Sequence, residues 1–270
     1  MSVAAHQPAL ESVRVLSNDR VAEGVGLVVL HAPGTAATVL PGQFVHLRVA
    51  TGTEIILRRP FSVHRAYDGR IEILYQVLGA GTLCLAERPV GASMDVVGPL
   101  GHGWEVPDGL SHALLVAGGL GAAPLGMLAE SMSASGVALT VAQGAPTRSR
   151  LVARQLFERV ARRVEIATDD GTLGERGFVV GPVQRLLVEE HFDQVYTCGP
   201  EIMQRRVAAL AEEAGIPCQV SLERLMACGI GACLSCVVAT VSGQKRACVD
   251  GPVFDAREVT WGDTERTLRH

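Results

Sequence analysis

The chain has 270 residues, a length typical of about two domains, and nearly half of them are apolar, which is enough for sizeable cores. Its formal net charge of −4 argues against nucleic acid as a general partner. No secretory signal precedes residue 20, so the seven cysteines favour a reducing cytoplasm and a metal or redox role.

Residues 1–108 are expected to form a small β-barrel or sandwich. Short segments rich in β-branched residues alternate there with Gly, Pro, Asp and Asn. The expected strands are Val13–Val15, Val25–His31, Phe44–Ala50 and Ile71–Val77. Turns are expected at Pro41-Gly42, Asp68-Gly69 and Gly98-Pro99.

Two motifs stand out in this half, RRPFS at Arg58–Ser62 and YQVLGAGT at Tyr75–Thr82. An arginine at a strand end can bind a diphosphate through two charge-assisted hydrogen bonds, and a nearby serine could reach a flavin nitrogen. The two glycines of the second motif would let backbone amides approach a phosphate, with the threonine hydroxyl as a further donor. Taken singly, the first motif is more typical of surface structure and the second of a turn.

Residues 109–219 alternate between buried strands and helices, which predicts a parallel sheet with helices on its faces. Strands are expected at Ala113–Ala117, Val137–Ala142, Val164–Ala167, Phe178–Val180 and Gln194–Thr197. Helices are expected after Pro124 through Met132 and at Arg154–Arg162, Val183–Glu190 and Ile202–Ala214. The apolar stretch Ala113–Ala129 contains four glycines and a proline and falls short of a membrane span.

The glycine-rich turn Gly118–Pro124 would present amides and a helix start to a pyrophosphate. The dinucleotide fingerprint G-x-G-x-x-G is incomplete, because Pro124 stands where the last glycine belongs. Downstream, Arg148 and Arg150 could favour a ribose 2′-phosphate, although exposed loop arginines are commoner. At another strand end, Cys198 could face a nicotinamide carbon, but a small buried hydrophobe is the more ordinary interpretation.

Residues 220–261 contain the most specific pattern, CGIGACLSC followed by a fourth cysteine. The ligands implied are Cys228, Cys233, Cys236 and Cys248, whose C-x4-C-x2-C…C spacing is that of a plant-type [2Fe–2S] cluster. A structural zinc site usually has two C-x2-C pairs, and disulfides need an oxidising compartment, so both are weaker alternatives. Residues 262–270 are polar and are expected to form a flexible tail.

Six motifs occur in one order: RPFS, GAGT, GGLGAAP, TDDG, CGPE and CGIGACLSC…C. In this order they resemble the ferredoxin-reductase superfamily, and more closely the electron-transfer subunits of type-B dihydroorotate dehydrogenases. The resemblance covers about Pro41 to Phe254. It implies a fold of class β plus α/β, with an N-terminal FAD-binding antiparallel β-barrel, a Rossmann-like parallel-sheet NAD domain and a small C-terminal [2Fe–2S] segment.

The resemblance also implies residue roles. FAD would contact Arg59, Pro60, Phe61, Ser62, Tyr75, Val77, Gly79, Gly81 and Thr82. The nicotinamide nucleotide would lie along Gly119, Gly121, Gly199 and Pro200, with Cys198 as the catalytic candidate. The four motif cysteines would ligate iron.

The partner implied is an FMN-containing catalytic subunit that oxidises dihydroorotate for pyrimidine biosynthesis, in a heterotetramer with two subunits of each kind. Electrons would pass from that FMN through the cluster and FAD to NAD⁺. No membrane partner is expected, and the expected location is the cytoplasm. A related branch contains subunits of flavin-based ferredoxin:NADP oxidoreductases, in which an aspartate replaces one cluster cysteine. A self-contained or ferredoxin-linked NAD(P)H-dependent reductase, and a zinc-bearing interaction protein, remain as alternatives.

Overall fold

The computed structural model describes residues 8–50, 52 and 55–262. The predicted tail lies outside this part of the chain from residue 263 onward. Within the described residues, no helix has both the length and the apolar character needed to cross a membrane.

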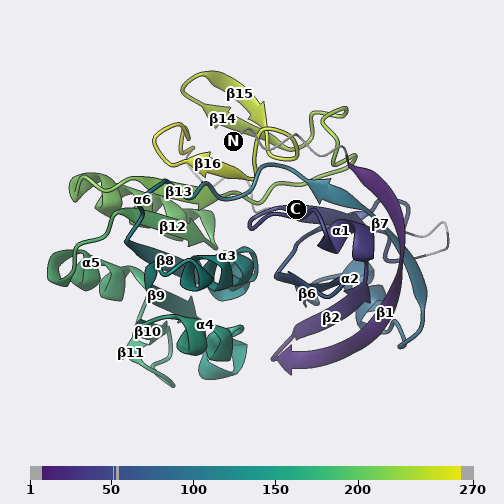
Figure 1. Cartoon of the computed structure of the whole chain (residues 1–270), viewed down its shortest axis with the longest axis horizontal. Helices are drawn as coiled ribbons and strands as arrows, with labels where there is room; N and C mark the ends of the chain where they lie inside the picture. The colour runs from purple at the N-terminus through teal and green to yellow at the C-terminus, as the bar shows by residue number, and fades with distance from the viewer. Residues whose placement is uncertain (1–7, 51, 53–54, 263–270) are drawn as a thin grey trace.

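The N-terminal half is a seven-stranded antiparallel sheet with the order β4-β3-β7-β1-β2-β6-β5. Figure 1 labels its strands β1, β2, β6 and β7. Its strands are β1 (Ala9–Ala22), β2 (Val25–His31), β3 (Phe44–Leu47), β4 (Arg59–Ser62), β5 (Arg65–Tyr67), β6 (Arg70–Gln76) and β7 (Ser93–Leu100), with the short helices α1 (Pro33–Ala36) and α2 (Ala80–Ala86). The sheet curls so that its two end strands, β4 and β5, come together. Between them, the His64 amide donates to the Glu72 carbonyl of β6 at 2.8 Å. The expected barrel is therefore present.

The second half is a sheet with the order β11-β10-β9-β8-β12-β13-β16, in which only β16 is antiparallel. Its strands are β8 (His112–Gly118), β9 (Ala138–Ala145), β10 (Arg163–Thr168), β11 (Glu175–Arg176), β12 (Gln194–Cys198), β13 (Cys218–Ser221) and β16 (Val253–Asp255). Its helices are α3 (Ala123–Ala134), α4 (Arg154–Val160), α5 (Val180–Glu189) and α6 (Glu201–Glu213), and Gly119–Ala122 and Arg148–Arg150 form 3₁₀ turns. The strand order reverses between β8 and β12, where ligands bind in such sheets.

Two local expectations are wrong. Gly98-Pro99 lies inside β7 rather than in a turn, at an irregularity in its pairing with β3, and proline is tolerated at such bulges. Phe178–Val180 is not a strand, because Val180 already begins α5. The amide of Gly181 there donates to the Phe178 carbonyl at 3.1 Å, and the Phe178 side chain is exposed.

The C-terminal segment joins the two halves (yellow in Figure 1). It adds β16 to the edge of the parallel sheet and forms a separate hairpin of β14 (Val237–Thr240) and β15 (Gly243–Arg246). Cys248 lies in the turn between β15 and β16. Phe44 of the barrel shares one apolar core with Leu114 of β8 and with Cys236 and Cys248.

Candidate functional site

The cluster loop, defined here as residues 228–236, lies between β13 and β14. Gly229 and Gly231 have φ values of +71° and +83°, a region in which side chains are strained. The bends direct two amides at one sulfur: those of Ala232 and Cys233 lie 3.3 and 3.4 Å from Cys228 Sγ. This geometry suits an anionic sulfur, since backbone donors stabilise a thiolate.

The four motif thiols fall into two hydrogen-bonded pairs, Cys228 with Cys233 and Cys236 with Cys248. Hydrogen bonds from Ser235 and then Cys228 lower the pKa of the exposed Cys233 to about 6. Burial and the neighbouring Cys236 raise the pKa of Cys248 to about 12. Iron binding at these positions would therefore have to displace a proton from Cys248 more than from Cys233.

Among the described residues, no three His, Cys, Asp or Glu side chains converge on a point for a single ion. A [2Fe–2S] cluster takes two thiolates on each of its two irons, so two pairs of cysteines fit its donor set. None of the seven cysteines forms a disulfide.

The predicted FAD motifs meet at Arg59 and Gly81. A Cβ on Gly81 would lie 2.9 Å from Arg59 Nε, so the guanidinium occupies the space that a side chain would fill. Arg59 Nη1 donates to the Leu57 carbonyl at 2.6 Å. The fork of Arg59 is thus held beside the backbone of α2, an arrangement suited to a diphosphate.

Other residues of the predicted FAD set make contacts within the protein. Tyr75 is buried, and its hydroxyl donates to Asn18 Oδ1 at 2.8 Å, while its ring packs edge-on against Phe61. The Thr82 hydroxyl accepts the Leu78 amide at 2.9 Å and contacts Gly79, so it caps the start of α2. Val77 is exposed, and its amide donates to the Gly24 carbonyl at 2.9 Å.

The predicted nicotinamide residues come together at the reversal of strand order. A Cβ on Gly121 would lie 2.6 Å from the amide nitrogen of Gly199, and a Cβ on Gly118 would lie 2.8 Å from Pro200 Cδ. The turns that follow β8 and β12 therefore pack backbone to backbone, which only glycine permits. Gly119, with φ +54°, has no atom within 4 Å of its Cβ position and faces open space.

Cys198 ends β12 and is 1% exposed. Burial, and then the charge of Glu223, raise the pKa of its thiol well above the ordinary range. The thiol is neutral and packed in the core, which supports the ordinary interpretation of this cysteine. Sequence reasoning gave no role to Glu223, which lies between β13 and the cluster loop.

The two loop arginines differ in their surroundings. Arg150 forms an ion pair with Glu23 at 3.7 Å, and Ser149 donates to the same carboxylate at 2.6 Å. The Arg148 side chain is exposed, and its backbone amide donates to Thr172. The β1–β2 turn thus packs on this loop, and its Glu23 carboxylate pairs with one of the two arginines, Arg150.

A second residue without a predicted role is His46 on β3. It is 1% exposed, and neither ring nitrogen has a hydrogen-bond partner in the described structure. Burial and the charges of Arg58 and Arg59 lower its pKa to about 4, so the ring is neutral at physiological pH. The signal that identifies His46 as a candidate is a buried polar group without a hydrogen-bond partner. Only the folded structure displays that signal.

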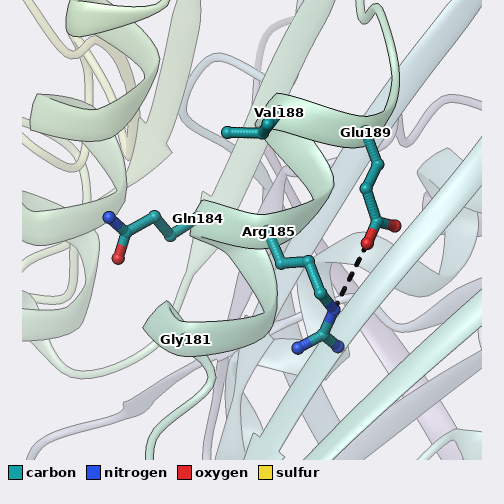
Figure 2. A pocket seen from close by; sticks show the side chains of 5 residues that line it. All are labelled: Gly181, Gln184, Arg185, Val188 and Glu189. Atoms are coloured by element: carbon teal, nitrogen blue, oxygen red, sulfur yellow. Dashed lines mark ion pairs between the residues drawn. The ribbon is translucent and has the colours of Figure 1, made fainter.

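The surface of the described residues includes the following two hollows. The first is formed by α5 alone, and Figure 2 shows its side chains with the Arg185–Glu189 ion pair of 3.8 Å. It contains none of the candidate site residues. The second lies beside the cluster loop and is lined by Leu234, Val237, Gln244, Lys245, Arg246 and Asp250.

Comparison with known proteins agrees with this layout. Residues 223–260 match the iron–sulfur cluster binding domain of dihydroorotate dehydrogenase B. The chain is 38% identical over 254 residues to the dihydroorotate dehydrogenase B (NAD(+)) electron transfer subunit of Desulforamulus reducens, covering 92% of this chain and 97% of the relative.

Among solved structures, the chain is similar to one from work on flavin-based electron bifurcation by an NADH-dependent reduced ferredoxin-NADP oxidoreductase. The TM-score is 0.85 at 31% identity, with 97% of this chain and 92% of that chain covered. A ferredoxin reductase of carbazole 1,9a-dioxygenase has the same fold, with a TM-score of 0.66 at 20% identity over 80% of this chain and 68% of that one.

Proposed function

This chain belongs to the family of dihydroorotate dehydrogenase B electron transfer subunits, and we propose that it passes electrons from an FMN-containing catalytic subunit through a [2Fe–2S] cluster and FAD to NAD⁺. The observation that carries the proposal is the position of the cluster loop. Gly229 of that loop packs on His46 of β3, and β3 pairs directly with the Arg59–Ser62 strand. The proposed cluster and flavin sites are thus neighbours.

The cofactors would account for the chemistry. A flavin exchanges one or two electrons, a [2Fe–2S] cluster exchanges one electron, and a nicotinamide exchanges a hydride, which carries two. The protein holds them in order. Cys228, Cys233, Cys236 and Cys248 would bind the irons, two on each. Arg59 and the Gly81 backbone would hold the FAD diphosphate, and β4 would support the ring through Pro60, Phe61 and Ser62.

The contacts of the remaining candidate residues assign them to three roles. Gly119, Gly121, Gly199 and Pro200 would line the nicotinamide nucleotide where the strand order reverses. Tyr75, Val77, Gly79 and Thr82 would shape the flavin pocket from behind, since the side chains of Tyr75 and Thr82 are engaged in the protein. Cys198 would contribute packing rather than a thiolate. We propose domain limits at residues 1–108, 109–219 and 220–261.

The proposed partner would dock at the cluster loop. Leu225, Ile230 and Leu234 are 88%, 57% and 62% exposed and lie on or near the loop that carries the exposed Cys233. Large apolar side chains gathered around a redox centre are typical of a surface that is covered in an assembly. A heterotetramer with two subunits of each kind, in the cytoplasm, completes the proposal, and the unpaired thiols support that compartment.

The test is analysis of the anaerobically purified chain, alone and co-expressed with an FMN-containing dihydroorotate dehydrogenase subunit. We expect two irons, two sulfides and one FAD per chain, and oxidation of NADH with an artificial acceptor. Dihydroorotate should be oxidised with NAD⁺ only when the partner is present. A colourless protein with stoichiometric zinc, or dihydroorotate oxidation by the isolated chain, would refute the proposal.

A second candidate function is a subunit of a ferredoxin-linked NAD(P)H oxidoreductase, favoured by the similarity to the bifurcating enzyme. The two candidates differ in partner. Copurification of an FMN-containing subunit supports the first candidate, whereas copurification of a larger flavoprotein that reduces ferredoxin supports the second.

A further inference from the structure

His46 lies where three candidate features of the site meet. It is on β3, between β4 and β7, opposite Pro60 of the proposed flavin strand and Val97 of β7. The contact with the cluster loop is close, since a Cβ on Gly229 would lie 2.8 Å from His46 Nδ1 and 2.9 Å from Cε1. Gly229 directly follows Cys228, the first proposed iron ligand.

The alternation of side chains along β3 tells which way the imidazole points. Val45 and Leu47 belong to the barrel core, whereas Phe44 belongs to the core that contains Cys236 and Cys248. His46 is on the same face as Phe44, because side chains two apart in a strand share a face. The ring therefore leaves the barrel interior and faces the C-terminal segment.

The imidazole lacks the partners that its burial requires. Both ring nitrogens are buried without a hydrogen bond, and leaving such a group unsatisfied costs its full desolvation penalty. A neutral imidazole carries one N–H donor and one acceptor nitrogen. An electron-rich acceptor on the cluster side would satisfy the donor, and the sulfurs of an iron–sulfur centre are such acceptors.

We propose that His46 donates its ring N–H to a sulfur of the iron–sulfur centre on the Cys228–Gly229 side, and so makes the cluster easier to reduce. The inference rests on the proposed function, since it requires a bound cluster. A donor stabilises the reduced form more than the oxidised form, because reduction adds negative charge to the sulfurs, and hydrogen bonds to sulfur are known determinants of cluster potential.

The first experiment is an anaerobic redox titration of the purified holoprotein, followed by EPR of the reduced cluster. His46→Leu removes the donor with little change in size, and His46→Asn keeps an N–H near the position of Nδ1. Phe44→Leu is the control, since it perturbs packing on the same face without changing any donor. Reduction of the cluster should become about tenfold less favourable in His46→Leu, or about 59 mV for one electron, and should be largely restored in His46→Asn.

An unchanged cluster potential in His46→Leu, or an equal change in Phe44→Leu, would overturn the inference. A shift of the flavin potential alone would do the same, because it would place the acceptor on the flavin. Iron and sulfide are measured first in the unsubstituted protein. If the unsubstituted protein contains no cluster, the proposed function itself is refuted. If the cluster is present but its potential does not change with substitution of His46, only this inference is refuted.

A second measurement keeps His46 in place, so it does not depend on whether the His46 variants fold. Pulsed EPR of the unsubstituted protein labelled with ¹⁵N-histidine should detect a nitrogen coupled to the reduced cluster. His102 also contacts the C-terminal segment, through its amide and the Gly251 carbonyl, so labelled His102→Gln is the assignment control and should keep the coupling. No ¹⁵N coupling, or its loss in His102→Gln, would contradict the role of His46.

Discussion

Arg59 shows how a single residue is prepared for a ligand. The Leu57 carbonyl, two residues before Arg59, accepts one N–H, and the absence of a side chain at Gly81 leaves room for the rest of the guanidinium. Holding a long side chain in place before binding reduces the entropy that binding must overcome. The arginine and the glycine are therefore one unit, although they belong to different motifs.

We predict that Arg59→Ala weakens FAD binding by about one to two orders of magnitude, because a charge-assisted hydrogen bond contributes about 1.5–3 kcal/mol. Gly81→Ala should act in the same direction by displacing the guanidinium. Flavin per chain after gel filtration measures both. Arg70→Ala, which removes an exposed arginine from neighbouring β6, is the control and should retain FAD. Full flavin occupancy in Arg59→Ala would contradict the role.

Asp193 offers a test of stability against pH. Its carboxylate accepts Ser111 Oγ at 2.6 Å and the amides of Ser111 and His112 at 3.0 and 2.8 Å. These bonds lower its pKa from 3.8 to about 2. Because the folded-state pKa is depressed, the stabilisation is present above about pH 4 and is lost as the pH falls toward 2.

We therefore predict that Asp193→Asn has a lower melting temperature at pH 7 and that the difference shrinks between about pH 4 and pH 2. Thermal unfolding at several pH values measures it. A difference that stays constant down to pH 2 would show that the carboxylate charge plays no part.

At the scale of elements, the cluster loop depends on glycine backbone conformations. We predict that Gly231→Ala lowers iron content and speeds loss of visible absorbance in air. Its φ of +83° strains any side chain, and the new Cβ would lie 2.6 Å from Val249 Cγ2. Gly243→Ala is the matched control, since φ is +109° in the β14–β15 hairpin but no atom lies within 4 Å. Equal iron retention in both variants would contradict the prediction.

The proposed fourth ligand, Cys248, lies on a separate element, the turn after β15. Cys248→Ser should abolish or destabilise the cluster while FAD remains bound, because serine is a poor ligand for iron that prefers thiolate. Cys218→Ser is the control, as Cys218 is equally buried on β13 but lies outside the motif. Iron, sulfide and flavin analysis of both variants measures the effect. Full iron content in Cys248→Ser would show that Cys248 is not a ligand.

At the scale of the whole molecule, Trp104 links the barrel to the parallel sheet. Its indole N–H donates to the Pro124 carbonyl at 2.9 Å, and its ring packs edge-on against Tyr196 at 5.7 Å. Pro124 is the second residue of α3, which follows the glycine-rich turn. Trp104 is therefore one of the contacts that fix the relative position of the two proposed nucleotide sites.

Trp104→Phe keeps an aromatic ring but removes the donor. We predict a loss of about 1–3 kcal/mol of unfolding free energy, since a buried carbonyl is left without a partner, and a melting temperature lower by several degrees. Differential scanning calorimetry of the holoprotein measures the effect, with FAD and iron content as controls. An unchanged melting temperature would mean that water replaces the indole N–H.

Much of the fold could be predicted from local pattern. The apolar run that became β8 and the strands β2, β6 and β9 follow from residue type within a few positions, and so do helices α3, α4 and α6. The strands β4 and β7 and helix α2 were missed, because their residues read locally as motif, turn or loop. Only pairing with β3 makes a strand of Arg59–Ser62.

The sequence by itself determined the cysteine spacing, the order of the motifs and the family to which they point, because these depend on neighbours in the chain. Tertiary structure alone decided that Arg59 meets Gly81, that Gly121 meets Gly199, and that His46 meets Gly229. Each of these contacts joins segments far apart in sequence. Strand register and the curl of the barrel bring them together, and no local preference encodes either.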